Sequence, residues 1–394
     1  MKRITKKKRI VVWLFLFLVL IFCSPFKGTE RAFAATENEE LNQTIAEQLE
    51  KLDLEELQEY LNSLEGYSEQ SVGERLLSYV KGGSFEYTSF FSQMSNLLLE
   101  NVKRLLPAFA SIAAITLLCG ILSSLKSNFL SDSSGEAIFL VGYISVLIPV
   151  LSVVIECFSA AKASVGDMQT QMQIVFPIML TLMSASGGAV SAAVYRPTVA
   201  FLCNAIVGLV AQVVFPITLT IIAFSMAGNL LKEMKFEKFT AFFKSINKWI
   251  MGASVSVFGL FFTLQGLTAA SYDGIARRAA KYAIGTGVPI VGGFLSGGFD
   301  LAVAGSVLIK NSLGSMSIFL MVSVLLEPLL LLIATGTLLR LTAAVTQPLG
   351  ESRISDFLSS TADHLNYCTA GLLITAFLYF VCVLLLVCST EAFF

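Results

Sequence analysis

Apolar runs recur along the chain after residue 104 and are separated by short stretches that hold most of the charged residues. A helix needs about 20 apolar residues to cross a bilayer. Eight runs come close to that length or exceed it: 105–125, 137–158, 174–194, 198–228, 249–271, 284–309, 315–339 and 367–388. We therefore expect an all-α, polytopic membrane protein with about six to eight membrane segments, some of them broken or re-entrant.

The composition supports this class. Of the 394 residues, 55% are hydrophobic and 14% are charged, and the mean hydropathy is +0.75. A soluble domain carries about 25% charged residues. The composition thus implies the lipid bilayer as a partner, and the net charge of −1 gives no reason to expect a nucleic-acid partner.

The first 34 residues have the layout of a secretory signal peptide. A basic head is followed by a 13-residue apolar core from Ile10 to Phe22, and Ala32-Phe33-Ala34 offers a cleavage site. The core is too short for a comfortable membrane span. We expect cleavage before Ala35, with a retained anchor as the alternative.

Residues 35–104 form a polar segment that the signal places outside the cytoplasm. It holds fourteen acidic and five basic residues, and its leucines recur at mostly helical spacing between 38 and 65. Two interpretations remain open for this acidic amphipathic helix. It could lie on the rim of the membrane domain, residues 105–394, or offer a docking surface to a partner's extracytoplasmic domain.

The run 284–309 is the candidate pore or gate because glycine costs a helix about 1 kcal/mol per position and proline about 3 kcal/mol. It could form a broken or re-entrant helix, or its glycines could only permit close helix packing. The candidate residues are Gly285, Gly287, Pro289, Gly292, Gly293, Gly297, Gly298 and Asp300, together with Glu327 in the next run.

Two of these candidates are carboxylates inside apolar runs. A charge at the centre of a bilayer costs about 2.5–3.5 kcal/mol on insertion scales. Asp300 and Glu327 could therefore serve a proton relay or an ion site. Alternatively, they are protonated or paired with Lys310 at a helix interface. Asn204, Gln212 and Gln265 are expected to form hydrogen bonds between helices.

The side of the membrane on which each loop lies depends on which runs cross it. With residue 104 outside and eight crossings, seven lysines and arginines fall on each side. If 198–228 and 284–309 instead enter and leave on one side, nine fall inside and five outside. Because inner loops are usually richer in these residues, the rule favours two re-entrant runs.

Residues 229–248 are basic and amphipathic. Such a helix is expected to lie in the plane of the membrane interface. Docking of a partner by this helix is the alternative.

Catalytic motifs are missing from the sequence. His364 is the single histidine, no P-loop or dinucleotide fingerprint is present, and the seven cysteines form no CxxC pair. We therefore expect no enzymatic activity, no catalytic residues, no metal site and no cofactor. Energy for any transport must come from a gradient or from a separate ATPase.

The glycine-rich run and its flanks resemble the stage III sporulation protein AE family of endospore formers. The resemblance is carried by GIARRAAKYAIGTGVPIVGGFLSGGFDLAVAGSVLIKNSLG, from Gly274 to Gly314. The candidate structural or topology residues in these flanks are Arg277, Arg278, Lys281 and Lys310.

The resemblance implies a multi-pass subunit in the mother-cell membrane that engulfs the forespore. It implies a secretion-like feeding channel, needed for late forespore gene expression. The implied partners are other stage III sporulation membrane proteins, a separate ATPase and a forespore membrane protein. The family supplies no catalytic residues. The alternative function is an autonomous ion-coupled secondary transporter or permease that uses Asp300 and Glu327.

Overall fold

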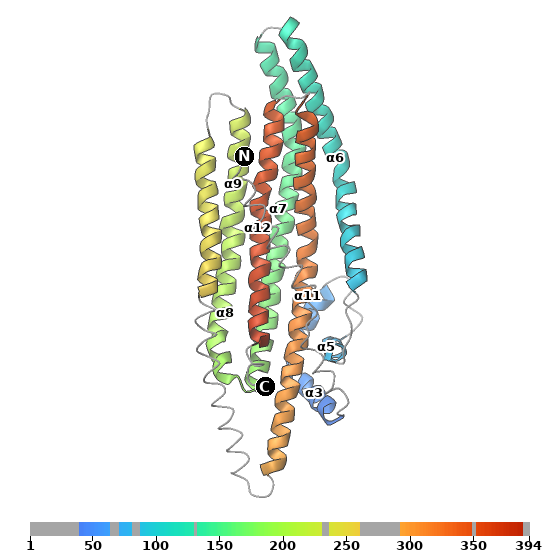
Figure 1. Cartoon of the computed structure of the whole chain (residues 1–394), viewed down its shortest axis with the longest axis vertical. Helices are drawn as coiled ribbons and strands as arrows, with labels where there is room; N and C mark the ends of the chain where they lie inside the picture. Colours follow the sequence, from blue (N-terminus) through green and yellow to red (C-terminus); the bar gives the residue numbers. More distant parts are fainter. Residues whose placement is uncertain are drawn as a thin grey trace.

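The protein is a bundle of very long helices that lie side by side along one axis (Figure 1). A computed structural model describes residues 39–63, 71–80, 87–129, 132–230, 236–260, 292–348 and 352–388. Three short helices come first: α3 (Glu39–Lys51), α4 (Glu55–Ser63) and α5 (Val72–Val80). The bundle holds α6 (Tyr87–Phe129), α7 (Asp132–Ala185), α8 (Ala189–Leu209), η1 (Val210–Val214), α9 (Phe215–Leu230), α11 (Gly292–Thr346) and α12 (Ser352–Cys388).

Five of the described helical stretches are long and apolar enough to cross a membrane. They are Ser95–Leu122, Phe139–Ala185, Ala189–Leu230, Asp300–Thr346 and Ser352–Cys388. The described residues contain no strand. The expectation of an all-α, polytopic membrane protein is therefore confirmed.

Two polar stretches that separate apolar runs in the sequence lie inside helices rather than in loops. The break between 137–158 and 174–194 lies within α7, and the break between 284–309 and 315–339 lies within α11. Lys310, which the topology counts place in an outside loop, is in the middle of α11. Gln169, Gln171, Gln173 and Lys310 bond to other parts of the chain, so these stretches continue as helix without a turn.

The run 198–228 differs from the expected re-entrant segment. It lies in one continuous helical path from Ala189 to Leu230, in which η1 forms a wide π-helical turn just before Pro216. π-Turns of this kind occur inside helices where the regular ladder is interrupted. Gly371 of α12 faces this turn, and a Cβ there would lie 3.2 Å from Val210 Cγ1.

The described part of the run 284–309 also continues without turning back. Residues 292–309 form the first part of α11, which extends to Thr346 even though Pro328 lies inside it. Residues 284–291 lie outside the described residues. The expectation that this run enters and leaves on one side therefore finds no support in its described part.

The described residues of 229–248 fall in two helices, since 229 and 230 end α9 and 237–248 begin another helix. Residues 237–260 form one helix, here called the basic helix, that runs beside α9 (yellow in Figure 1). Phe224 of α9 stacks on Phe236, Phe239 and Phe243, with ring centroids 5.8, 6.0 and 5.7 Å away. These ring contacts hold the start of the basic helix along α9, not across it.

The core of the bundle lies along α11 and α12. α11 packs against α12, α7, α6 and α3. The most apolar windows of α11 and α12 are each 61% buried, compared with 33% for that of α6. The apolar side chains of α11 and α12 thus pack largely against other parts of the protein.

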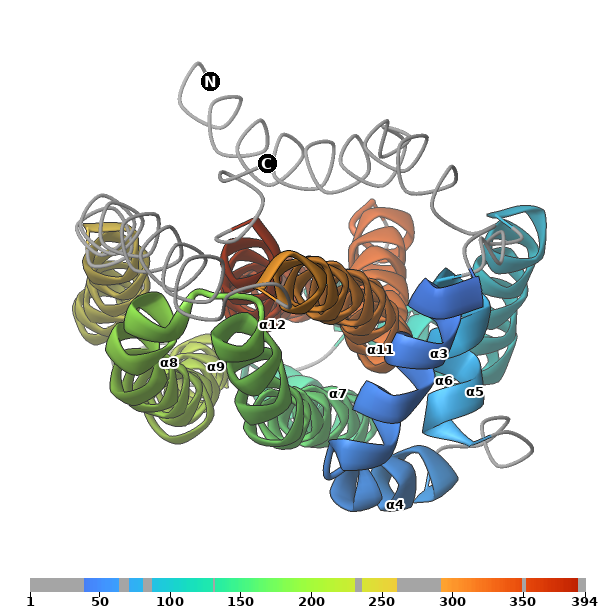
Figure 2. The same ribbon diagram turned by 90° about the horizontal axis from the view of Figure 1, so that it is seen from below.

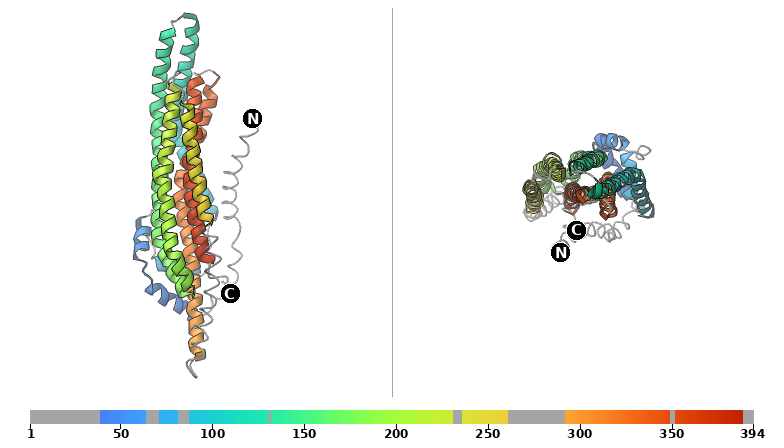
Figure 3. Two further views of the ribbon diagram at one scale, coloured as in Figure 1. Left: turned by 90° about the vertical axis from the view of Figure 1, so that its left-hand side faces the viewer. Right: turned by 90° about the horizontal axis from the view of Figure 1, so that it is seen from above.

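The ends of the bundle are staggered. The α6–α7 hairpin extends beyond the other helices at one end, and the start of α11 extends beyond them at the other (Figure 3). Seen along the axis, α3, α4 and α5 lie on the side of the bundle away from α8 (Figure 2). The N-terminal acidic segment is therefore attached near the start of α11.

Candidate functional site: the buried side of α11 and the pocket between α7 and α8

The middle of α11 approaches α12 so closely that only glycine fits at position 314. A Cβ at Gly314 would lie 2.5 Å from Val387 Cγ2 and 3.5 Å from Met179 Cε of α7. Small residues let membrane helices approach in this way. At this position, glycine serves close helix packing.

Lys310 lies one turn before this contact and is completely buried. Its Nζ donates a hydrogen bond of 2.8 Å to the carbonyl oxygen of Val387, in the last turn of α12. The last carbonyls of a helix lack partners within the helix and carry a partial negative charge. The Lys310 side chain therefore joins α11 to the last described turn of α12 from within the core. Its predicted structural role is consistent with this position.

The N-terminal segment is fastened to α11 by Gln48 of α3. Gln48 Nε2 donates to the carbonyl oxygen of Ala302 at 2.8 Å, and the Ser306 hydroxyl donates to Gln48 Oε1 at 3.2 Å. A Cβ at Gly305 would lie 3.0 Å from Gln48 Oε1. Ile45 is fully buried in the same contact. The apolar face of α3 thus covers α11, as the rim interpretation expects.

A second contact fastens α4 to the bundle. The Gln171 amide of α7 donates to the Tyr60 hydroxyl at 2.9 Å and to the carbonyl oxygen of Leu320 at 3.3 Å. Burial raises the pKa of Tyr60. The acidic side chains remain on the outside of these helices, where Glu47, Glu50, Glu55, Glu56 and Glu59 are exposed. The outer face is therefore available for the predicted docking of a partner.

The other candidates of the glycine-rich run fall into two groups. Gly292, Gly293, Gly297 and Gly298 lie on the first two turns of α11. Outside the described residues lie Gly285, Gly287, Pro289, Arg277, Arg278 and Lys281. Their role in a pore, gate or topology signal stays a prediction.

The structure does not bring Asp300 and Glu327 together. Both lie on α11, where 27 residues correspond to about 40 Å. Asp300 is half-buried near the start of the helix, and Glu327 is exposed. The two carboxylates are therefore too far apart to bind one ion together.

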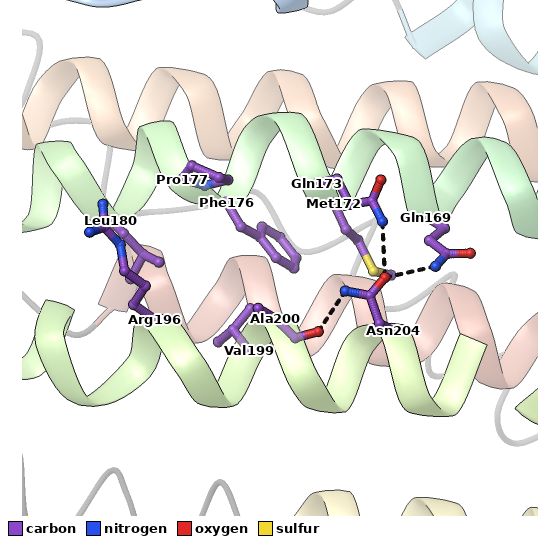
Figure 4. A pocket seen from close by; sticks show the side chains of 10 residues that line it. All are labelled: Gln169, Met172, Gln173, Phe176, Pro177, Leu180, Arg196, Val199, Ala200 and Asn204. Atoms are coloured by element: carbon purple, nitrogen blue, oxygen red, sulfur yellow. Dashed lines mark hydrogen bonds between the residues drawn. The ribbon is translucent and has the colours of Figure 1, made fainter. Parts of the chain in front are cut away.

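A pocket of about 160 Å³ lies between α7 and α8 (Figure 4). At one end, Asn204 Oδ1 accepts hydrogen bonds from Gln169 Nε2 at 2.7 Å and from Gln173 Nε2 at 2.9 Å. Arg196 lies at the other end, and the ring of Phe176 lies between them. The remaining lining residues are Met172, Pro177, Leu180, Val199 and Ala200.

The pocket can receive a small apolar group between two polar ends. The carboxamides offer hydrogen bonds, and Arg196 offers a cation. Asn204 forms the hydrogen bonds between helices that the sequence predicts. Gln212 is exposed, and Gln265 lies outside the described residues.

The comparisons with known proteins now identify the family. The family model named Stage III sporulation protein AE matches residues 72–390. The chain belongs to the stage III sporulation protein AE family. It is also 23% identical to the "Stage III sporulation protein AE" of Bacillus subtilis (strain 168) over 377 residues, which cover 93% of this chain and 94% of the relative. No solved structure matches it.

The match to the stage III sporulation protein AE family begins at α5. It includes Lys310, Gly314 and the pocket between α7 and α8, whereas α3 and α4 precede it. The resemblance seen in the sequence between Gly274 and Gly314 is thus confirmed, and it extends over most of the chain. Membership establishes a sporulation protein, and the apolar helices establish a membrane protein.

Two features of this family member were not predicted from its sequence. Gln169, Gln171 and Gln173 lie in a polar stretch that resembles a loop, yet every second residue there is a glutamine, which was the available signal. Gly314 lies just outside the glycine-rich run. Among the described residues, no group of three or more His, Cys, Asp or Glu side chains could hold a metal ion.

Proposed function

We propose that this protein is a non-enzymatic membrane subunit of a sporulation-specific secretion or feeding channel complex. The complex links mother cell and forespore and is required for late forespore gene expression. The subunit lies in the mother-cell membrane around the forespore. Its partners are other stage III sporulation membrane proteins, a separate ATPase and a forespore membrane protein. Membership in the stage III sporulation protein AE family supports this proposal.

The length of α11 is the observation that carries the proposal. Its 55 residues correspond to about 82 Å, whereas the hydrocarbon core of a bilayer is about 30 Å thick. Even a tilt of about 40° would leave roughly 63 Å along the membrane normal. α11 must therefore extend beyond the bilayer, and α3 with its acidic outer face is attached near its start. This architecture suits a subunit that joins partners outside the membrane.

The proposal is tested in the spore-forming host, with a tagged chain that replaces the chromosomal copy. Glu55→Lys combined with Glu59→Lys reverses two exposed charges on α4 without touching its buried face. We expect normal protein levels, loss of co-purifying stage III proteins and reduced late forespore reporter activity. Glu136→Lys, at an exposed position near the tip of the α6–α7 hairpin, is the matched control.

Two results would contradict this function. One is unchanged late forespore expression when the chromosomal copy is removed. The other is autonomous substrate flux by the purified protein alone in liposomes, which would favour the transporter alternative.

A further inference from the structure

A second polar region lies where α11, α12 and the basic helix meet. Arg340 Nη2 of α11 lies 3.0 Å from Asp363 Oδ1 of α12. Lys244 of the basic helix is close enough to Asp363 for their charges to interact. Lys248 Nζ lies 5.9 Å from the centroid of the Tyr367 ring. Three helices thus bring two cations to the Asp363 carboxylate and a third, Lys248, beside Lys244, and we call this group the cationic cluster.

A buried histidine borders the cationic cluster. His364 is next to Asp363 on α12 and is only 3% exposed. Neither of its ring nitrogens has a hydrogen-bond partner in the described part of the chain. It lies within range of the charge of Lys244. A buried polar group without a partner is unfavourable, so a polar ligand that reaches it would stabilise the site.

The charges of the cluster do not balance. Asp363 is shared between Arg340 and Lys244, while the Lys244 and Lys248 ammonium groups repel each other. Charged groups in membrane proteins are usually paired. The surplus positive charge therefore calls for an anion from outside the described residues.

The basic helix continues from the cluster as an apolar surface. Trp249, Val257 and Leu260 are 75%, 55% and 67% exposed, and no charged residue occurs from 249 to 260. Tryptophan is enriched where the headgroups of a membrane meet its hydrocarbon. The distance from Trp249 to Leu260 along the helix is about 17 Å, which is close to half of the roughly 30 Å hydrocarbon thickness.

These observations together specify a ligand with an anionic head and an apolar tail. We propose that the cationic cluster binds the phosphate of an anionic phospholipid, whose acyl chains lie along Trp249, Val257 and Leu260. Basic pockets between membrane helices bind anionic headgroups by the same chemistry. His364 supplies a hydrogen-bonding side chain beside the phosphate. The site fixes the level of one membrane surface at Lys248 and Trp249.

Trp249 provides a fluorescent reporter at the proposed site. The chain has two tryptophans, so the Trp13→Phe variant leaves Trp249 as the single emitter. The full-length variant is reconstituted in phosphatidylcholine vesicles that contain a small fraction of brominated lipid, which quenches nearby tryptophan. We expect brominated phosphatidylglycerol to quench Trp249 more strongly than brominated phosphatidylcholine at equal mole fraction.

Two variants test whether the cationic cluster causes the stronger quenching by brominated phosphatidylglycerol. Combining Lys244→Gln with Lys248→Gln should make the two brominated lipids quench equally. Lys238→Gln removes an exposed lysine six residues before Lys244 on the same helix and should keep the preference. Melting temperatures of all variants in detergent establish that they are folded.

Three results would overturn the proposal. They are equal quenching by both lipids in the parent protein, an unchanged preference in the double lysine variant, and relief of the quenching by inorganic phosphate. The last result would mean that the cluster takes a free anion rather than a lipid headgroup.

Discussion

Ser164 and Pro328 show how single residues allow α11 to remain continuous. Proline lacks the amide hydrogen that would bond to the carbonyl four residues earlier, which here belongs to Val324. The Ser164 hydroxyl of α7 donates a hydrogen bond of 3.0 Å to that carbonyl oxygen. Freed backbone groups in membrane helices must find partners of this kind. The sequence indicates a kink at Pro328, but it cannot show which distant side chain fills the gap.

We predict that Ser164→Ala destabilises the protein by about 1 kcal/mol or more, because the Val324 carbonyl is left without its partner. In a Pro328→Ala background the backbone restores that bond, so Ser164→Ala should cost less. Thermal unfolding of the four proteins in detergent gives the coupling between the two sites. The control is Ser152→Ala, whose exposed hydroxyl bonds only within α7. If Ser164→Ala lowers the stability equally in both backgrounds, the Ser164 hydroxyl does not replace the bond that Pro328 lacks.

Helix packing explains which glycines matter on α11. The sequence singles out the glycine-rich run 284–309, whereas among the described glycines of α11 the tightest contact is at Gly314. Composition cannot distinguish such a glycine from Gly336, where an added Cβ would meet no atom within 4 Å. The difference depends on how α11 and α12 are aligned. That alignment is set in part by the bond from Lys310 to Val387, which no local pattern reveals.

We predict opposite effects for the same substitution at these two glycines. Gly336→Ala should maintain or raise the melting temperature, since alanine favours a helix over glycine by about 1 kcal/mol. Gly314→Ala should lower it, because the new methyl group would collide with Val387. Adding Val387→Ala to the second variant should restore part of the loss. Equal melting temperatures for the two single variants would contradict the packing of α11 on α12.

At the scale of the whole molecule, the sequence predicted the class and the family but not the layout. Apolar runs of span length identified a polytopic helical membrane protein. They could not show that polar stretches such as Gln169–Gln173 lie inside a 54-residue helix. The reason is physical: polar side chains can end a membrane span without ending the helix, and Gln169, Gln171 and Gln173 here bond to other parts of the chain. The two re-entrant segments were expected from the distribution of lysines and arginines, a count that assumed each apolar run crosses or re-enters the membrane as a separate segment.

The continuity of α11 is tested most directly by a distance between two spin labels. The protein would carry Val307→Cys and Leu341→Cys in a variant whose seven native cysteines are replaced. An uninterrupted helix places the two positions about 51 Å apart, since 34 residues each rise about 1.5 Å. Pulsed electron-electron resonance in lipid nanodiscs should give one narrow distribution near that value. A chain that turned back between 310 and 314 would leave about 27 residues of rise, so a distribution centred at about 40 Å or below would contradict the account.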